Sequence, residues 1–144
     1  MSNFPEMTPV KYVKPTVKHG KALVKLCRTD RMIGIIQVVA KGGETNLHSH
    51  QHLDGLWFVL SGTVRFYGEN NKVIGDFGKY EGVLVPRGCP YWFEAVGDTE
   101  AEIMQVEAFD QAFVDDTSLH RDRVDYEKRS RPMESFIEAA DVTA

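Results

Sequence analysis

Three of the chain's five histidines fall within one heptapeptide, His48–Asp54. If this segment is a strand, His48 and His50 point to the same face, because side chains two residues apart do so. Two imidazoles aimed at one point are how a β-scaffold builds a metal site, since neutral imidazole suits Zn, Cu, Fe and Ni. The spacing therefore indicates a divalent metal centre, and the alternative is a polar loop that holds no ligand.

Other kinds of chemistry find no support in the sequence. It has no P-loop and no GxSxG, GxGxxG or CxxC pattern, so neither nucleotide binding nor serine nucleophile chemistry is expected. Seventeen basic against 21 acidic residues give a net charge of −4, which leaves no basic surplus to neutralise nucleic-acid phosphates. No apolar run approaches the ~20 residues that span a bilayer. The N-terminal residues lack the basic start and apolar stretch of a signal peptide, so we expect a cytoplasmic protein without membrane partners.

The elements that must position the histidines are short strands. Residues 22–109 consist of brief apolar runs separated by glycine and proline turns, with no helical window. Met32–Ala40 is β-branched and too short for most helices, and Thr63–Phe66 alternates between polar and apolar residues. This pattern predicts an all-β domain, an antiparallel sandwich or barrel.

Two flanking segments differ from this β region. Residues 1–21 hold three prolines and predict an extended arm, whereas residues 110–144 are charge-rich. The mixed-sign run Arg121-Asp122-Arg123 is typical of a solvated face. Met133, Phe136, Ile137 and Ala140 follow the i, i+3, i+4, i+7 spacing of a short amphipathic helix. Because neither flank can fold alone, we expect one of them to dock on a second subunit of a homodimer.

The histidine segment resembles the first signature of the cupin superfamily, G-x5-H-x-H-x(3,4)-E-x6-G. Gly42, His48, His50 and Gly62 stand at the matching spacings, and Pro86-Arg87-Gly88 resembles part of the second signature, G-x5-P-x-G-x2-H-x3-N. The resemblance spans roughly residues 35–109 and implies a small antiparallel jelly-roll barrel. Cupins include dioxygenases, isomerases, cyclases, lyases, decarboxylases and non-enzymatic binders, so the resemblance leaves the function open.

Two of the four ligand positions of these signatures are lost. Gly55 stands where the first signature places its acid, and Tyr91 stands where the second places its histidine. The neighbouring Asp54 would point away from the histidines unless a bulge at Gly55 re-aimed it. The resemblance thus implies a divalent ion (Fe, Zn, Mn or Ni) held by His48 and His50, with Asp54, His52 or Tyr91 completing the site.

Three functions remain open on this basis. The first is a metal-dependent dioxygenase, cyclase or isomerase that acts on a small organic molecule, aromatic or polyketide-like. The second is a metal-independent isomerase or lyase that uses His48, His50 and Tyr91 as acid and base. The third is a non-catalytic cupin that binds a small molecule.

A substrate pocket can be outlined from same-face partners. Trp57 and Phe93 would form an aromatic wall with Tyr91 if these side chains face the interior. Gln37 and Glu107 are polar residues on otherwise apolar strands and need buried partners or solvent. Whether Glu107 points inward is left open by the sequence.

Overall fold

The computed structural model describes residues 3–41, 45–112, 122–127 and 134–138. No helix within these residues is long and apolar enough to cross a membrane. The strands are β1 (Lys21–Arg28), β2 (Met32–Val39), β3 (His48–His50), β4 (Leu53–Ser61), β5 (Thr63–Tyr67), β6 (Val73–Phe77), β7 (Gly82–Val85), β8 (Trp92–Val96), β9 (Ala101–Phe109), β10 (Arg123–Asp125) and β11 (Glu134–Glu138). A single 3-10 turn, Glu69–Asn71, interrupts them within the described residues.

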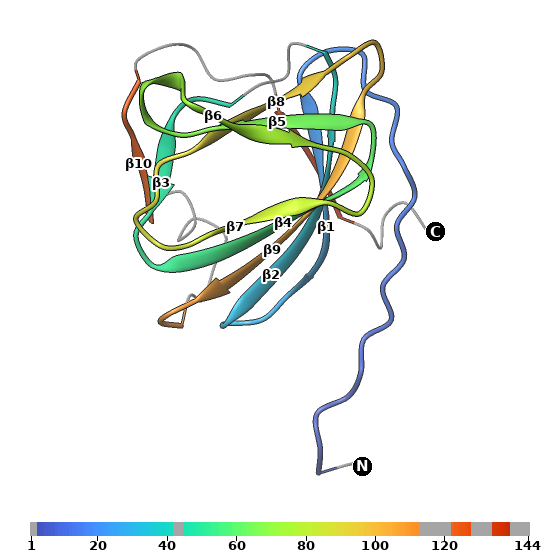
Figure 1. Cartoon of the computed structure of the whole chain (residues 1–144). Coiled ribbons are helices and arrows are strands. Elements are labelled where there is room, and N and C mark those ends of the chain that lie inside the picture. Colours follow the sequence, from blue (N-terminus) through green and yellow to red (C-terminus); the bar gives the residue numbers. More distant parts are fainter. Residues whose placement is uncertain (1–2, 42–44, 113–121, 128–133, 139–144) are drawn as a thin grey trace.

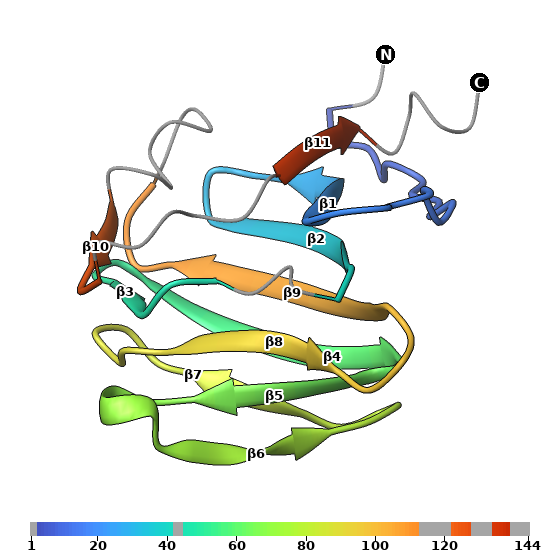
Figure 2. The same ribbon diagram turned by 90° about the horizontal axis from the view of Figure 1, so that it is seen from above.

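The strands form a jelly-roll barrel from two facing sheets (Figures 1 and 2). The large sheet has the order β11-β1-β2-β9-β4-β7 and the small sheet the order β6-β5-β8. A third pair, β10 with β3, lies at one end of the barrel, between the two sheets (Figure 1). The prediction of an all-β antiparallel jelly roll is confirmed.

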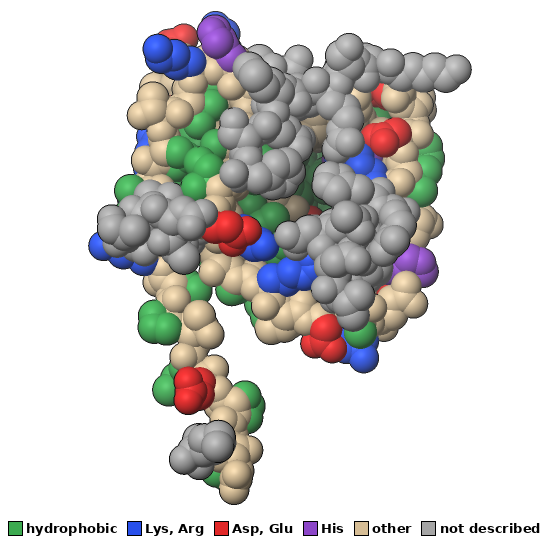
Figure 3. Space-filling view, turned by 180° about the vertical axis from the view of Figure 1, so that it is seen from behind, with side chains coloured by type: hydrophobic (Ala, Val, Ile, Leu, Met, Phe, Trp, Pro, Cys, Tyr) green, Lys and Arg blue, Asp and Glu red, His purple; other side chains and the backbone are tan. Residues whose placement is uncertain are grey.

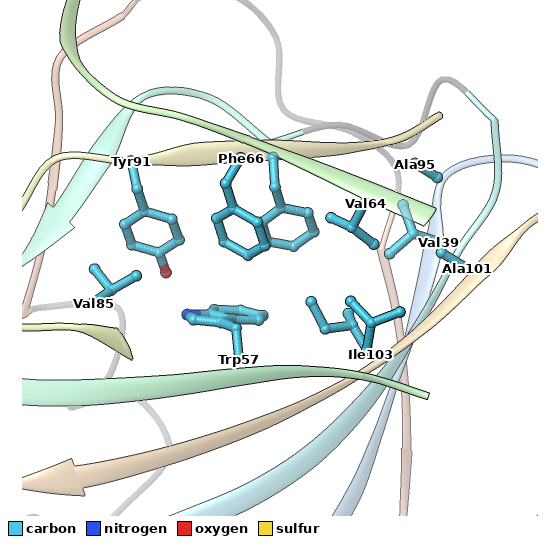
Figure 4. Packing of buried hydrophobic residues seen from close by; sticks show 11 residues of the cluster. Val39, Trp57, Val64, Phe66, Val85, Tyr91, Ala95, Ala101 and Ile103 are labelled. Atoms are coloured by element: carbon cyan, nitrogen blue, oxygen red, sulfur yellow. The ribbon is translucent and has the colours of Figure 1, made fainter. Parts of the chain in front are cut away.

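Alternation along the strands divides inner from outer side chains. On β9, the odd-numbered residues from Ala101 to Phe109 are buried, and the even-numbered residues between them are more exposed. The core inside the barrel is aromatic as well as aliphatic, with Trp57, Phe66 and Phe93 in mutual contact (Figure 4). Tyr91 lies at one end of this cluster, beside the end of the barrel that carries the histidines (Figure 4).

The predicted C-terminal helix is wrong for the residues that the structure describes. Glu134–Glu138 form strand β11, which pairs in parallel with β1, and Lys25 Nζ lies 2.8 Å from Glu138 Oε1. A segment this short cannot hold a helix alone, whereas the open edge of β1 offers it a row of backbone hydrogen bonds. Met133 and Ala140, which completed the helical spacing, lie outside the described residues.

The N-terminal arm is extended, as expected, and residues 3–20 form no strand or helix. The arm approaches the barrel and then runs alongside it to β1 (Figure 1). The barrel itself starts at Lys21 and its last long strand ends at Phe109, while the charged extension adds β10 and β11.

Candidate functional site

The short strand β3 brings His48 and His50 together. Their ring centroids lie 5.3 Å apart with nearly perpendicular planes. Tyr91 forms a backbone bridge with His48, since each N–H donates to the other's carbonyl, and their rings lie 4.4 Å apart. The structure thus places the three predicted site residues side by side at one end of the barrel interior.

Both imidazoles are held through Nδ1. His48 Nδ1 lies 2.5 Å from the carbonyl oxygen of Asn46, so Nδ1 donates the proton and Nε2 is left as an acceptor. His50 Nδ1 lies 3.2 Å from Oδ2 of Asp122. Burial lowers the pKa of His48 to about 2, and the charge of Arg123 acts in the same direction. Burial also lowers the pKa of His50 against the opposing effect of Asp122, so both rings are neutral near pH 7.

Tyr91 keeps its proton. Burial raises the pKa of its hydroxyl well above the ordinary value, and the nearby carboxyl of Glu107 adds to the rise. The hydroxyl points from the ring toward the indole of Trp57, whose ring centroid lies 5.8 Å away (Figure 4). A buried phenol with a high pKa is a hydrogen-bond donor over the whole physiological pH range.

Glu107 points into the barrel, which settles the orientation left open by the sequence. It lies on β9 directly across from Gly55 on β4, and only 2% of its surface is exposed. Gln105 Nε2 donates to Glu107 Oε1, and Gln37 Nε2 donates to Gln105 Oε1 at 2.7 Å. Burial raises the pKa of Glu107 to about 7, while the bond from Gln105 opposes the rise and Asp122 adds to it.

The glycine at position 55 leaves room for its neighbours. A Cβ added there would lie 3.2 Å from Trp57 Nε1 and 4.0 Å from Glu107 Cγ. Glu107 therefore brings a carboxyl from the neighbouring strand toward the position where the first cupin signature has its acid. Sequence spacing along one strand could not reveal this, because the two residues meet only through the pairing of β4 with β9.

Asp54 and His52, two candidates for the third ligand, do not join the histidines. Asp54 lies on the outer face of β4, where its Oδ1 accepts from the backbone N–H of Arg87 at 3.0 Å. The β4 register has no shift near Gly55, so no bulge re-aims the Asp54 side chain. His52 is exposed, with Nδ1 3.4 Å from an oxygen of Asp110.

Two residues of the charged run form part of the site, contrary to the expectation of a solvated face. Asp122 has a fully buried carboxylate that contacts His50 and accepts from the backbone N–H of Gln51 at 3.1 Å. Arg123 lies across from His50 in the β10–β3 pair, and its Nε donates to Asp125 Oδ1 at 2.8 Å. No signal in the sequence separates these buried charges from solvated ones.

His50, Tyr91 and Glu107 help to line a small cavity of about 10 Å³, which has room for about one water molecule. Of the predicted substrate-pocket residues, Trp57 and Glu107 line it, whereas Phe93 and Gln37 lie outside its lining. Phe93 belongs to the aromatic core, and Gln37 reaches Glu107 only through Gln105. The lining consists of His50, Leu53, Gly55, Trp57, Val85, Pro86, Tyr91 and Glu107.

A comparison with models of protein families shows to which family this chain belongs. The family model described as Cupin domain matches residues 35–121, more than half of the chain. This chain belongs to the cupin family. None of the curated proteins compared matches this cupin.

Solved structures with the same fold are distant in sequence. A protein with a double-stranded beta-helix domain from Klebsiella pneumoniae is 19% identical, with a TM-score of 0.64 over 81% of this cupin and 87% of that chain. An RmlC-like cupin from Desulfovibrio desulfuricans is 18% identical, with a TM-score of 0.59 over 72% and 97%. KdgF from Halomonas sp. is 13% identical, with a TM-score of 0.58 over 78% and 92%. At these identities the likeness concerns the fold alone.

The donor set for a metal ion is incomplete in the described part of this cupin. His48 and His50 have the features of metal-binding imidazoles, because each Nδ1 is fixed by an oxygen partner and leaves Nε2 available. Yet no three side chains of His, Cys, Asp or Glu within the described residues come together as ligands. Two imidazoles fall short of the three protein ligands of a tight site, so we assign no chemical step to a metal.

Proposed function

We propose that this cupin is a cytoplasmic enzyme that transfers a proton on a small polar organic molecule, as an isomerase, cyclase or lyase does. Glu107 is the acid–base group, and Tyr91 and His50 orient the substrate. The observation that carries the proposal is the carboxyl of Glu107, buried in the wall of the pocket with an amide as its hydrogen-bond donor. A carboxyl with a pKa about 7 can both take and give a proton near neutral pH.

The polar groups beside Glu107 can bind and orient a carbonyl compound. The Tyr91 hydroxyl can donate to a carbonyl oxygen, and Nε2 of neutral His50 can accept from a substrate hydroxyl. The carboxylate of Glu107 then removes a proton from the carbon next to the carbonyl. The same carboxyl returns that proton to another carbon in an isomerisation, or to the leaving group in an elimination. His48, which packs behind Tyr91, is a positioning residue.

Proton exchange in D₂O tests this function across a panel of candidate substrates. Small keto and hydroxy acids and reducing sugars are incubated with the protein, and loss of C–H signals is followed by NMR. We expect exchange in at least one compound and a drop of about 100-fold in its rate for Glu107→Gln, which keeps the shape and removes the titrating group.

The matched control is Glu94→Gln on β8, a partly exposed position whose carboxylate accepts from Tyr67. This variant should exchange at the wild-type rate. Exchange that survives Glu107→Gln unchanged would remove Glu107 from the chemistry. Saturable binding of a compound without any exchange would favour the non-catalytic alternative.

The second candidate is a metal-dependent cupin, favoured by the fixed Nδ1 atoms of the two histidines. Titration with Zn, Mn, Ni and Fe(II), followed by calorimetry, measures the affinity directly. If a metal binds, His48→Ala and His50→Ala should each weaken it at least about tenfold. Asp54→Ala is the matched control and should leave the affinity unchanged, because Asp54 faces outward. A large loss with Asp54→Ala would contradict the placement of the site.

A further inference from the structure

Arg123 lies beside the cavity without belonging to its lining. It is paired with His50 across β10 and β3, and paired residues of an antiparallel sheet point to the same side. His50 lines the cavity, so the Arg123 side chain lies next to it, and only 11% of that side chain is exposed. Arg123 thus places a permanent positive charge at the end of the barrel that carries the site.

The guanidinium of Arg123 has donors that are not in use. Its Nε donates to Asp125, and within the described residues the two Nη groups have no hydrogen-bond partner. The other acid nearby, Asp122, is turned to His50 and to the backbone of Gln51. The remaining N–H groups form a planar fork, which is the geometry that binds a carboxylate through two parallel hydrogen bonds.

The charge of Arg123 acts on the other groups of the site. Burial is the main cause of the shifted pKa values of His48, His50 and Tyr91, and in all three the charge of Arg123 acts to lower the pKa. The wider surface attracts no anions, because the net charge is −4 and side chains of both signs are interspersed on the face that Figure 3 shows. A preference for an anionic ligand must therefore come from a cation at the site itself.

We infer that Arg123 determines the specificity of the site and selects a small carboxylic acid, whose carboxylate it binds through its Nη groups. This substrate class refines the proposed function, on which it rests. The cavity has room for about one water molecule, so only an oxygen-sized part of a ligand can enter it. A carbonyl or hydroxyl oxygen of the acid takes this place beside Tyr91 and His50, and the carboxylate on the next carbon lies outside the cavity against Arg123.

Binding of matched acids and amides tests this selectivity without any turnover. 2-Oxobutanoate and 2-hydroxybutanoate are each titrated into the protein in parallel with the neutral amide of the same skeleton, and dissociation constants are obtained from NMR chemical shifts. In wild type we expect at least one acid to bind about tenfold or more tightly than its amide, as two charge-assisted hydrogen bonds allow. Arg123→Gln should bind acid and amide alike. Arg123→Lys keeps the charge without the fork and should show a reduced preference.

Arg65→Gln is the matched control. Arg65 on β5 also donates from Nε to an aspartate, Asp76, but it lies on the outer face of the small sheet. This variant should keep the full preference for the acid. Circular dichroism verifies that each variant is folded.

Three results would overturn the role of Arg123. They are a wild type that binds neither acid more tightly than its amide, an unchanged preference in a folded Arg123 variant, and a lost preference in Arg65→Gln. The proposed function fails separately, because Glu107→Gln should keep the preference although it transfers no proton. Exchange confined to neutral sugars would retain proton transfer and exclude Arg123 as the selecting residue. A preference for the acid without exchange in any compound would retain Arg123 and exclude proton transfer.

Discussion

Replacing Glu107 with glutamine should raise the free energy of unfolding by about 3 kcal/mol at pH 8. The folded protein holds the pKa of this carboxyl at about 7, against an ordinary value of 4.5. At pH 8 wild type therefore bears the cost of an ionised carboxylate inside the barrel. Each pKa unit corresponds to about 1.4 kcal/mol, so the rise of the pKa from 4.5 to about 7 amounts to about 3 kcal/mol. Glutamine fills the same space, still accepts from Gln105 and carries no charge.

The sign of the pH dependence follows from the raised pKa. Between pH 4.5 and 7 the folded state holds the Glu107 proton while the unfolded state has lost it, so this group's contribution to stability falls as the pH rises through that window. The gain in the free energy of unfolding from Glu107→Gln should therefore shrink to under about 1 kcal/mol at pH 5. Urea denaturation of both proteins at pH 5 and pH 8 gives the comparison. A gain that is equal at both pH values would mean that Glu107 titrates normally.

Replacing Gly82 with alanine should destabilise the protein by at least about 3 kcal/mol. Gly82 begins β7 and pairs with Phe58 on β4. A Cβ at position 82 would lie 1.8 Å from the backbone oxygen of Trp57, and backbone cannot rotate away as a flexible side chain can. The two strands must separate to admit the methyl group, which displaces Val85 from the pocket wall. The unfolding midpoint in urea measures the loss.

Gly88→Ala provides the matched comparison for this glycine. Gly88 has a φ of +76°, yet a Cβ there would meet nothing within 4 Å. This variant carries the strain of a left-handed conformation without a collision, which costs about 1 kcal/mol. Equal losses in the two variants would show that contact with the Trp57 backbone is not the cause.

The strands and the histidine pair were predictable because their signals are local. The β-branched run from Met32 and the two-residue spacing of His48 and His50 depend on periodicity along one strand. The same parity argument correctly turned Asp54 outward in the absence of a bulge. Where the local signal was ambiguous, as in Glu134–Glu138, the free edge of β1 decided the conformation.

The rest of the site depends on pairings between distant segments. Glu107 faces Gly55 only because of the register between β9 and β4. Asp122 contacts His50 across a separation of 72 residues, from a charged run that looks like any solvated segment. Such contacts arise from tertiary structure and carry no pattern in the neighbouring residues.

The parallel pairing of β11 with β1 has a consequence for how the chain is made. Lys21 pairs with Glu134, so the first strand of the barrel must wait for a segment synthesised much later. Until then, a nascent chain on the ribosome presents β1 with an unsatisfied backbone edge, to which another strand could add. Contacts so distant along the chain also slow folding, because the loop between them must close first. Translation speed and chaperone capture during this interval should therefore influence the yield of native protein.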